Sequence, residues 1–168
     1  MAKRPEKFLF HDPALCMGCH SCEIACKLEH DLPAGVNRVR MVTEGPKMVD
    51  GELELHYDRI GCMHCARPPC INACPTSAIK KRPDGIVQID ESRCTGCQTC
   101  AEVCPYDAIE FHPEKNWAEL CDLCAHRLDD ELLPFCVKHC LSGALFYGTG
   151  EEFKQRREKV AARVGKAR

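Results

Sequence analysis

Long apolar stretches are absent from this sequence of 168 residues. The N-terminus, MAKRPEKFLFHDPALCM, has only Phe8, Leu9 and Phe10 as an apolar run before His11. That run is too short for a secretory leader, and no twin-arginine motif is present. No stretch approaches the length that a membrane-spanning helix needs. We therefore expect a cytoplasmic protein with no direct membrane span.

Recognisable catalytic patterns are also missing. The sequence has no paired carboxylates, nucleophile triad or glycine-rich phosphate loop, so we expect no enzymatic activity from this chain alone. The net charge is −2, and of the 23 lysines and arginines ten lie in residues 1–7 and 151–168. The body between these ends is acidic, unlike the basic face of a nucleic-acid-binding protein, and no nucleic-acid partner is expected.

Cysteine, in contrast, is abundant, with sixteen residues. The hydrophobic fraction of 45% includes these cysteines, so the remaining apolar core is thin for the length. An even number of cysteines would suit a disulfide framework in an oxidising compartment. In a reducing cytoplasm, clustered cysteines usually bind metal, and we favour metal here.

The cysteines form four groups of four, with none left over. They are Cys16, Cys19, Cys22 and Cys26 (group one); Cys62, Cys65, Cys70 and Cys74 (group two); Cys94, Cys97, Cys100 and Cys104 (group three); and Cys121, Cys124, Cys136 and Cys140 (group four). Groups one and three share the spacing C-x2-C-x2-C-x3-C. Groups two and four share C-x2-C, a variable spacer and C-x3-C. The groups are internal repeats, which indicates that all four have the same function.

The residues after the last cysteine repeat as well. Groups two, three and four continue as PTSAI, PYDAI and LSGAL, which predicts a recurring turn into a strand. Group one continues as KLEHD and has no proline after Cys26, so its loop geometry should differ.

Three further elements are predicted from local pattern. Residues 78–79 and 86–89 flank Pro83-Asp84-Gly85 and predict a hairpin. Residues 36–43 and 52–57 alternate in polarity around a turn that contains Gly45, Pro46 and Gly51, which predicts a second hairpin. Residues 151–164 predict a basic helix with Phe153, Val160 and Val164 on one side, either solvated or docked on a partner.

Cubane iron–sulfur clusters need one thiolate for each of four irons, and group three matches the bacterial run for this cofactor. In such C-x2-C-x2-C-x3-C-P runs the fourth cysteine binds the other cluster of a pair. Cys94, Cys97 and Cys100 should therefore hold one cluster and Cys104 its neighbour. Zinc remains an alternative for group four, whose two pairs are widely spaced. A thioredoxin-like dithiol is disfavoured because no C-x2-C pair stands alone.

Histidines also lie within the motifs, at His20, His64, His126 and His139. Since the cysteine count leaves no ligand position vacant, we interpret them as potential-tuning or structural residues. Trp117 lies outside the motifs and is interpreted as a packing residue.

With four such motifs in this order, the chain resembles the four-cluster iron–sulfur subunits of molybdenum and tungsten bis-pterin oxidoreductases. Dimethyl sulfoxide reductase, formate dehydrogenase, polysulfide reductase and tungsten aldehyde oxidoreductase have such subunits. The resemblance covers residues 8–150. It implies an α+β fold of two nested bacterial-ferredoxin-like modules, with small antiparallel hairpins and a C-terminal helix. The outer module would comprise 8–35 and 116–150, the hairpin insertion 36–57, the inner module 58–115 and the basic helical tail 151–168.

The same resemblance implies four cubane 4Fe-4S clusters with crossed ligand sets. They are set A (Cys16, Cys19, Cys22, Cys140), set B (Cys26, Cys121, Cys124, Cys136), set C (Cys62, Cys65, Cys70, Cys104) and set D (Cys74, Cys94, Cys97, Cys100). All sixteen cysteines would bind iron, and no other metal ligand is implied.

The implied function is electron transfer between a molybdo- or tungstopterin catalytic subunit and a second redox partner. The short chain favours an aldehyde oxidoreductase or formate dehydrogenase type of complex, with a flavin- or NAD-linked subunit as a further partner. Copies of the chain docked end to end are a further expectation. The alternatives are a polyferredoxin that serves a hydrogenase or carbon monoxide dehydrogenase, and a zinc-binding scaffold.

Overall fold

The computed structural model describes residues 6–164 as strands and helices connected by loops. The architecture is the expected α+β type. In chain order the elements are β1 (Phe8–His11), the 3-10 helix η1 (Pro13–Leu15), α1 (Ser21–His30), β2 (Val39–Val49), β3 (Glu52–Gly61), α2 (Pro69–Ala73), β4 (Ile79–Lys81), β5 (Val87–Ile89), the 3-10 helix η2 (Glu91–Arg93), α3 (Thr99–Glu102), β6 (Ile109–Phe111), β7 (Ala118–Leu120), α4 (Ala125–Asp129), α5 (Phe135–Lys138), β8 (Leu145–Gly148) and α6 (Gly150–Val164).

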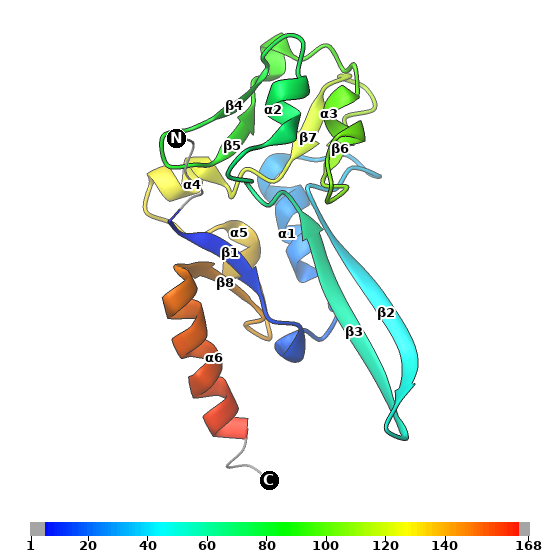
Figure 1. The fold of residues 1–168 in the computed structure, drawn as a ribbon, viewed down its shortest axis with the longest axis vertical. Helices are drawn as coiled ribbons and strands as arrows, with labels where there is room; N and C mark the ends of the chain where they lie inside the picture. Colours follow the sequence, from blue (N-terminus) through cyan, green and yellow to red (C-terminus); the bar gives the residue numbers. More distant parts are fainter. Residues whose placement is uncertain (1–5, 165–168) are drawn as a thin grey trace.

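The strands form separate antiparallel pairs, β1–β8, β2–β3, β4–β5 and β6–β7. The β1–β8 pair joins distant parts of the sequence, with Phe8 opposite Gly148 and His11 opposite Leu145. Figure 1 shows this pair below the segment that contains α2, α3 and β4 to β7. The first and last strands therefore close one half of the molecule, while the middle of the sequence builds the other half.

The predicted turn into a strand after three cysteine groups is confirmed. In each case the third residue after the cysteine has positive φ, the fourth is a buried alanine and the fifth begins a strand. The positive-φ residues are Ser77 (51°), Asp107 (47°) and Gly143 (68°). The alanines are Ala78, Ala108 and Ala144, and the strands are β4, β6 and β8. One local sequence pattern thus starts three strands.

The second predicted hairpin exists, but its turn is shorter than expected. β2 and β3 pair from Val39 opposite Gly61 to Val49 opposite Glu52. The loop is Asp50-Gly51, with φ of 50° and 87°, as a two-residue type I′ turn requires. Gly45 and Pro46 were predicted in the turn, and this was wrong. They lie in β2 where the register shifts, a position that tolerates proline. Figure 1 shows the hairpin extending away from the body.

Two hydrophobic clusters form the interior, and cysteine contributes to both. The first gathers buried residues from both ends of the sequence and from the base of β2, including Leu9, Val39 and Leu145. The second lies among β4 to β7 and includes Ile79 and Ile109. Because thiol side chains occupy so much of each interior, the fold depends on whatever those thiols bind.

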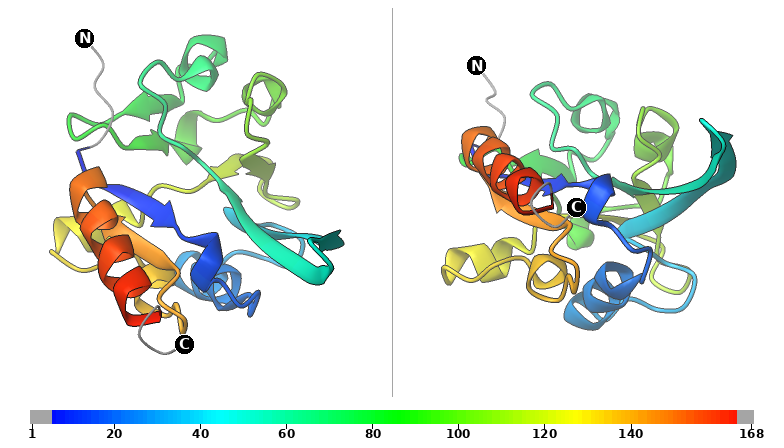
Figure 2. Two further views of the ribbon diagram at one scale, coloured as in Figure 1. Left: turned by 60° about the horizontal axis from the view of Figure 1, so that its bottom comes forward. Right: turned by 90° about the horizontal axis from the view of Figure 1, so that it is seen from below.

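The predicted C-terminal helix is confirmed as α6, and it packs on the body of the protein. Phe153 stacks on Phe10 with ring centroids 4.6 Å apart, and Arg156 donates to the carbonyl of Gly143. Figure 2 shows α6 alongside β1 and β8. The side chain of Val164 and residues 165–168 lie outside the described part of the protein. Within residues 6–164, no helix is both long and apolar enough to cross a bilayer.

Candidate metal centres

The first C-x2-C loop of each group shares one backbone feature. The residue before the second cysteine has positive φ: Gly18 (64°), His64 (42°), Gly96 (67°) and Leu123 (58°). This conformation costs a non-glycine residue about 1–2 kcal/mol, so His64 and Leu123 keep it only because their surroundings require it. Such turns let successive backbone N–H groups converge, an arrangement found around many iron–sulfur sites.

Glycine is required in two of these loops for a second reason. A Cβ on Gly18 would lie 2.3 Å from Cε1 of Tyr57, and a Cβ on Gly96 would lie 2.3 Å from the carbonyl oxygen of Asn116. Neither distance is compatible with a side chain. The group one and group three loops are therefore held tightly against neighbouring segments.

The cysteines of set A lie around one small cavity. Cys16, Cys19, Cys22 and Cys140 line it together with apolar side chains that include Met41 and Leu145. Cys140 is thus beside group one rather than with its own group. This placement argues against a closed zinc site made from group four alone, which would need all four of its cysteines together.

Cys26 occupies the complementary position in set B. Burial is the main cause that raises the pKa of its thiol, and the charges of Cys121, Cys136 and Cys124 raise it further. α1 is longer than its counterpart α3 and carries Cys26 toward group four. The missing proline after Cys26 is consistent with this continuous helix.

The two remaining sets lie in the half built from the middle of the sequence. The cysteines of set C line a second cavity with Val87, Ile109 and Leu120. In set D, burial is the main cause that raises the pKa of Cys100 to about 11, and the charges of Cys70 and then Cys94 raise it further. The charge of Cys74 acts on Cys97. In each case a thiol from one group lies near thiols of another group.

Thiols of different sets lie close enough for the charge of one to act on another. The charge of Cys22 in set A acts on Cys136 in set B. The charge of Cys121 in set B acts on Cys62 in set C. The charge of Cys70 in set C acts on Cys100 in set D. Set A therefore neighbours set B, set B neighbours set C, and set C neighbours set D.

The exposure of the cysteines differs between sets A and D, at the two ends of this series, and sets B and C between them. Of the sixteen cysteines only Cys19 and Cys97 are exposed, and they belong to sets A and D. A hydrogen bond with Ser21 lowers the pKa of the Cys19 thiol, and one with Thr99 lowers that of Cys97. Sets A and D therefore each have an exposed cysteine, whereas all four thiols of set B are buried and those of set C are buried or half-buried.

Most thiols of sets B and C do not readily lose their proton in the absence of a cation. Burial raises the pKa of Cys62 to about 12, that of Cys136 to about 12 and that of Cys70 to about 11. Binding to iron requires the thiolate, so the positive charge of the metal must offset the cost of burial. A buried group of four thiols therefore fits an iron–sulfur cluster and would be unfavourable as four free anions.

Backbone N–H groups already point at several of these sulfur atoms. The amide of Ala78 donates to Sγ of Cys74 at 3.2 Å, and that of Leu145 donates to Sγ of Cys140 at 3.4 Å. The amide of Ala118 donates to Sγ of Cys94 at 3.4 Å. Donors to thiolate sulfur stabilise negative charge and are one of the means by which proteins set cluster potentials.

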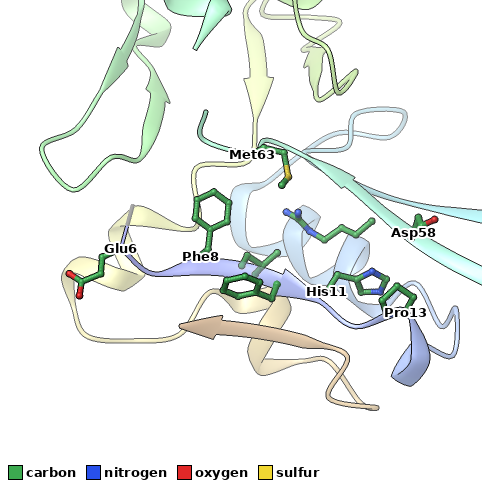
Figure 3. A pocket seen from close by; sticks show the side chains of 9 residues that line it. Glu6, Phe8, His11, Pro13, Asp58 and Met63 are labelled. Atoms are coloured by element: carbon green, nitrogen blue, oxygen red, sulfur yellow. The ribbon is translucent and has the colours of Figure 1, made fainter. Parts of the chain in front are cut away.

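Arg59 brings a positive charge close to set B. Its Nη2 lies 3.5 Å from Sγ of Cys121, and its Nε is buried without a hydrogen-bond partner among the described residues. Figure 3 shows the neighbouring pocket of about 480 Å³, around which Phe8, His11, Asp58 and Met63 are arranged. No cysteine lines that pocket, so it is separate from the four sets. A half-buried guanidinium beside a thiol fits an anionic cofactor.

The four histidines within the motifs make hydrogen bonds to protein groups. His64 is fully buried, and its Nδ1 accepts a hydrogen bond from the amide of Val87 at 2.9 Å. His20 contacts Glu23, His126 contacts Glu29, and His139 contacts the carbonyl of Phe135.

His30 is a site residue that was not singled out from the sequence. Its Nε2 lies 3.4 Å from Sγ of Cys124. Only its position at the end of the helix that carries Cys22 and Cys26 could have indicated this contact.

Comparison with protein families agrees with this chemistry. A model described as a 4Fe-4S dicluster domain matches residues 53–150, and a second model with the same description matches residues 15–78. The protein belongs to the 4Fe-4S dicluster family. Together the two matches span every cysteine of the sequence, and this dicluster protein therefore has 4Fe-4S clusters as its cofactor.

Relatives of this dicluster protein cover most of its length. It is 37% identical to the thiosulfate reductase electron transfer subunit of Salmonella typhi, over 86% of this sequence and 76% of the relative. It is 37% identical to one component of the polysulfide reductase of Wolinella succinogenes, over 92% and 82%. It is 41% identical to one component of the tetrathionate reductase of Salmonella typhimurium, over 79% of this sequence and only 54% of that longer relative. The resemblance to iron–sulfur subunits such as that of polysulfide reductase is confirmed.

Proposed function

We propose that this chain is a non-catalytic electron-transfer subunit that carries four 4Fe-4S clusters in a line. One observation carries the proposal: the four sets of thiols succeed one another from A to D, and only the two end sets have an exposed cysteine. Shielded centres between two accessible ends suit a relay that receives an electron at one surface and releases it at another.

The proposed ligands are the four crossed sets, A to D, as implied by the resemblance. When bound, the clusters supply one-electron redox centres. The protein holds each cluster from two distant segments, so neither segment can move away without breaking a ligand set. The nested domain organisation, with an outer module of 8–35 and 116–150 and an inner module of 58–115, is part of the same proposal.

The described residues also support the proposal through their electrostatics. Backbone amides donate to thiol sulfurs at the turns that precede β4 and β8, and Arg59 lies beside Cys121. These groups stabilise negative charge on the thiolates of sets A, B and D. No such group is placed to transform a substrate, so substrate chemistry belongs to a partner.

The partner is inferred from the relatives. Thiosulfate, tetrathionate and polysulfide reductases are named in their descriptions, which favours a reductase complex over the aldehyde oxidoreductase or formate dehydrogenase types expected from chain length. We propose a molybdo- or tungstopterin catalytic subunit at one end of the line and a second redox subunit at the other. A flavin-linked subunit, further copies of the chain and a cytoplasmic location remain predictions.

Metal analysis of the anaerobically purified chain tests the cofactor content. The proposal predicts about sixteen irons and sixteen acid-labile sulfides per chain, four for each cubane. A chain with zinc, or with about half this iron after full reconstitution, would contradict it. Mass spectrometry of co-purifying subunits should identify a pterin-containing protein.

The relay is tested by placing a charge at each end in turn. Met17 and Thr95 are the exposed second residues of the equivalent loops in sets A and D. Met17→Glu should slow electron exchange with one partner, and Thr95→Glu should slow exchange with the other, while iron content stays unchanged. If both variants impair the same partner equally, the two ends do not serve separate partners.

A further inference from the structure

A chain of hydrogen-bonded side chains leads to one sulfur atom of set B. Nε1 of Trp117 donates to Oε1 of Glu119 at 2.7 Å. Oε2 of the same carboxylate accepts from Nε of Arg38 at 2.7 Å. Nη1 of Arg38 lies 2.9 Å from Nδ1 of His30, and Nε2 of His30 lies 3.4 Å from Sγ of Cys124. These hydrogen bonds connect β7, the segment before β2, the end of α1 and the group four loop.

The position of the proton on His30 follows from this geometry. A guanidinium can only donate, so Nδ1 of His30 must accept the hydrogen bond from Arg38. In the neutral imidazole the proton then lies on Nε2, the atom that faces Cys124. The nearest carboxylate oxygen, Oδ1 of Asp122, is 3.6 Å from Nε2 and is too distant for a good hydrogen bond. The N–H group is thus directed at sulfur.

Burial keeps this arrangement in place. The side chains of His30, Arg38 and Glu119 have exposed fractions of 8%, 12% and 4%. The ring of His126 packs edge-on against His30 with centroids 5.5 Å apart. Because the His30 ring is buried and held by Arg38, its rotation would break the hydrogen bond to Arg38.

A cation site is the competing interpretation of the same residues. His30, Asp122 and His126 have ligand atoms within 4.8 Å of one another. However, Nη1 of Arg38 is 3.5 Å from Oδ1 of Asp122 and already supplies a positive charge there. A metal ligand also needs a free lone pair, and Nε2 of His30 carries a proton. The geometry is therefore that of a donor to sulfur.

We propose that His30 is a potential-tuning residue, which donates from Nε2 to the Cys124 thiolate and raises the reduction potential of the cluster held by set B. This inference rests on the proposed function, because it requires that set B holds a cluster. Reduction adds one negative charge to the cluster, and part of this charge resides on the thiolate sulfurs. An N–H donor stabilises the reduced form more than the oxidised form. Arg38 acts one step away by fixing which nitrogen of His30 carries the proton.

The test is a potentiometric titration of the cluster-loaded full chain, followed by electron paramagnetic resonance under anaerobic conditions. His30→Leu removes the donor and retains an apolar side chain of similar bulk. His30→Gln retains an N–H close to the position of Nε2. His126→Leu is the matched control, since His126 touches the same ring but its hydrogen bond goes to Glu29.

The expected result is a lower midpoint potential for one cluster in His30→Leu. The equilibrium constant for its one-electron reduction should fall about tenfold, which corresponds to about 59 mV. His30→Gln should recover most of this shift, and His126→Leu should leave all potentials in place. Unchanged potentials in His30→Leu, or an equal shift in His126→Leu, would overturn the inference.

Labelling covers the case in which His30→Leu fails to assemble its clusters. In the unaltered chain with 15N-labelled histidine, pulsed resonance should detect a nitrogen coupled to one reduced cluster, and His30→Gln should lack that coupling. Absence of any such coupling in the unaltered chain would overturn the role of His30. An unaltered chain without iron would instead overturn the proposed function, and iron analysis distinguishes the two failures.

Discussion

Replacement of Gly18 by alanine should destabilise the site formed by set A. Gly18 has φ of +64°, and a new Cβ would lie 2.3 Å from the ring of Tyr57. The left-handed backbone costs alanine about 1–2 kcal/mol. Overpacking against the ring adds about 1–3 kcal/mol. The total of about 2–5 kcal/mol corresponds to a change of about 30-fold to about 5,000-fold in an equilibrium constant.

A matched control separates the two contributions. Gly35 has φ of +85° with no atom within 4 Å of a new Cβ, so Gly35→Ala meets only the backbone cost. The double variant Gly18→Ala with Tyr57→Ala removes the collision but keeps the backbone cost. Comparison with Tyr57→Ala alone completes a double-mutant cycle, which isolates the contact between the two side chains.

The assay is cluster retention, because unfolding of a cluster-loaded protein is not a reversible two-state process. Iron per chain after anaerobic purification should fall by about one cluster of four irons in Gly18→Ala. The visible absorbance of the clusters should also decay faster in denaturant. Equal iron content and equal decay in Gly18→Ala and Gly35→Ala would refute the collision with Tyr57.

Three other outcomes are expected. Gly96→Ala should lose a cluster more completely than Gly18→Ala. Its new Cβ would meet the backbone carbonyl of Asn116, which cannot move away as a side chain can. Similar iron content in the two variants would contradict this. Phe153→Ala should increase hydrogen exchange in α6 but leave iron content unchanged, because the stacking on Phe10 holds the helix to the body; lost iron would show that α6 supports the clusters. Iron removal by a chelator should abolish most of the secondary structure measured by circular dichroism, because cysteine occupies both hydrophobic clusters; a native spectrum without iron would show that the apolar core suffices.

Short sequence patterns predicted the strands and helices that depend on neighbouring residues in the sequence. The alanine and aliphatic residue after three cysteine groups marked the starts of β4, β6 and β8, since a buried alanine and a tight turn recur there. The hairpin around Pro83-Asp84-Gly85 and the helix over 151–164 followed from turn chemistry and helical periodicity. The spacing of the cysteines identified the cofactor class because short thiol loops suit a cubane cluster.

Contacts between distant segments could not be predicted in the same way. The pairing of Phe8 with Gly148 depends on how the whole chain folds. The first strand has only four residues, which gives little pattern from which to predict it. Gly45 and Pro46 suggested the turn of the β2–β3 hairpin. The turn is instead formed by Asp50-Gly51, and Gly45 and Pro46 lie within β2. The positive φ of Leu123 is imposed by its loop rather than by its residue type.

His30 shows why part of the site was overlooked. It stands outside all cysteine motifs, and its role depends on Arg38 and Cys124, which lie in other elements. Of the histidines within the motifs, which were predicted to be potential-tuning or structural residues, His126 contacts a glutamate and His139 contacts a backbone carbonyl. Proximity in sequence to a ligand is a weak guide to which side chain donates to its sulfur.

Crossed ligation is the central claim, and serine substitution at four positions tests it most directly. Serine can keep a cluster while shifting its midpoint potential, so each variant reports which of the four potentials belongs to the altered residue. Cys26→Ser should shift the same potential as Cys121→Ser, and Cys140→Ser the same potential as Cys16→Ser. If Cys26→Ser instead shifts the potential that responds to Cys16→Ser, each group holds its own cluster and the account is contradicted.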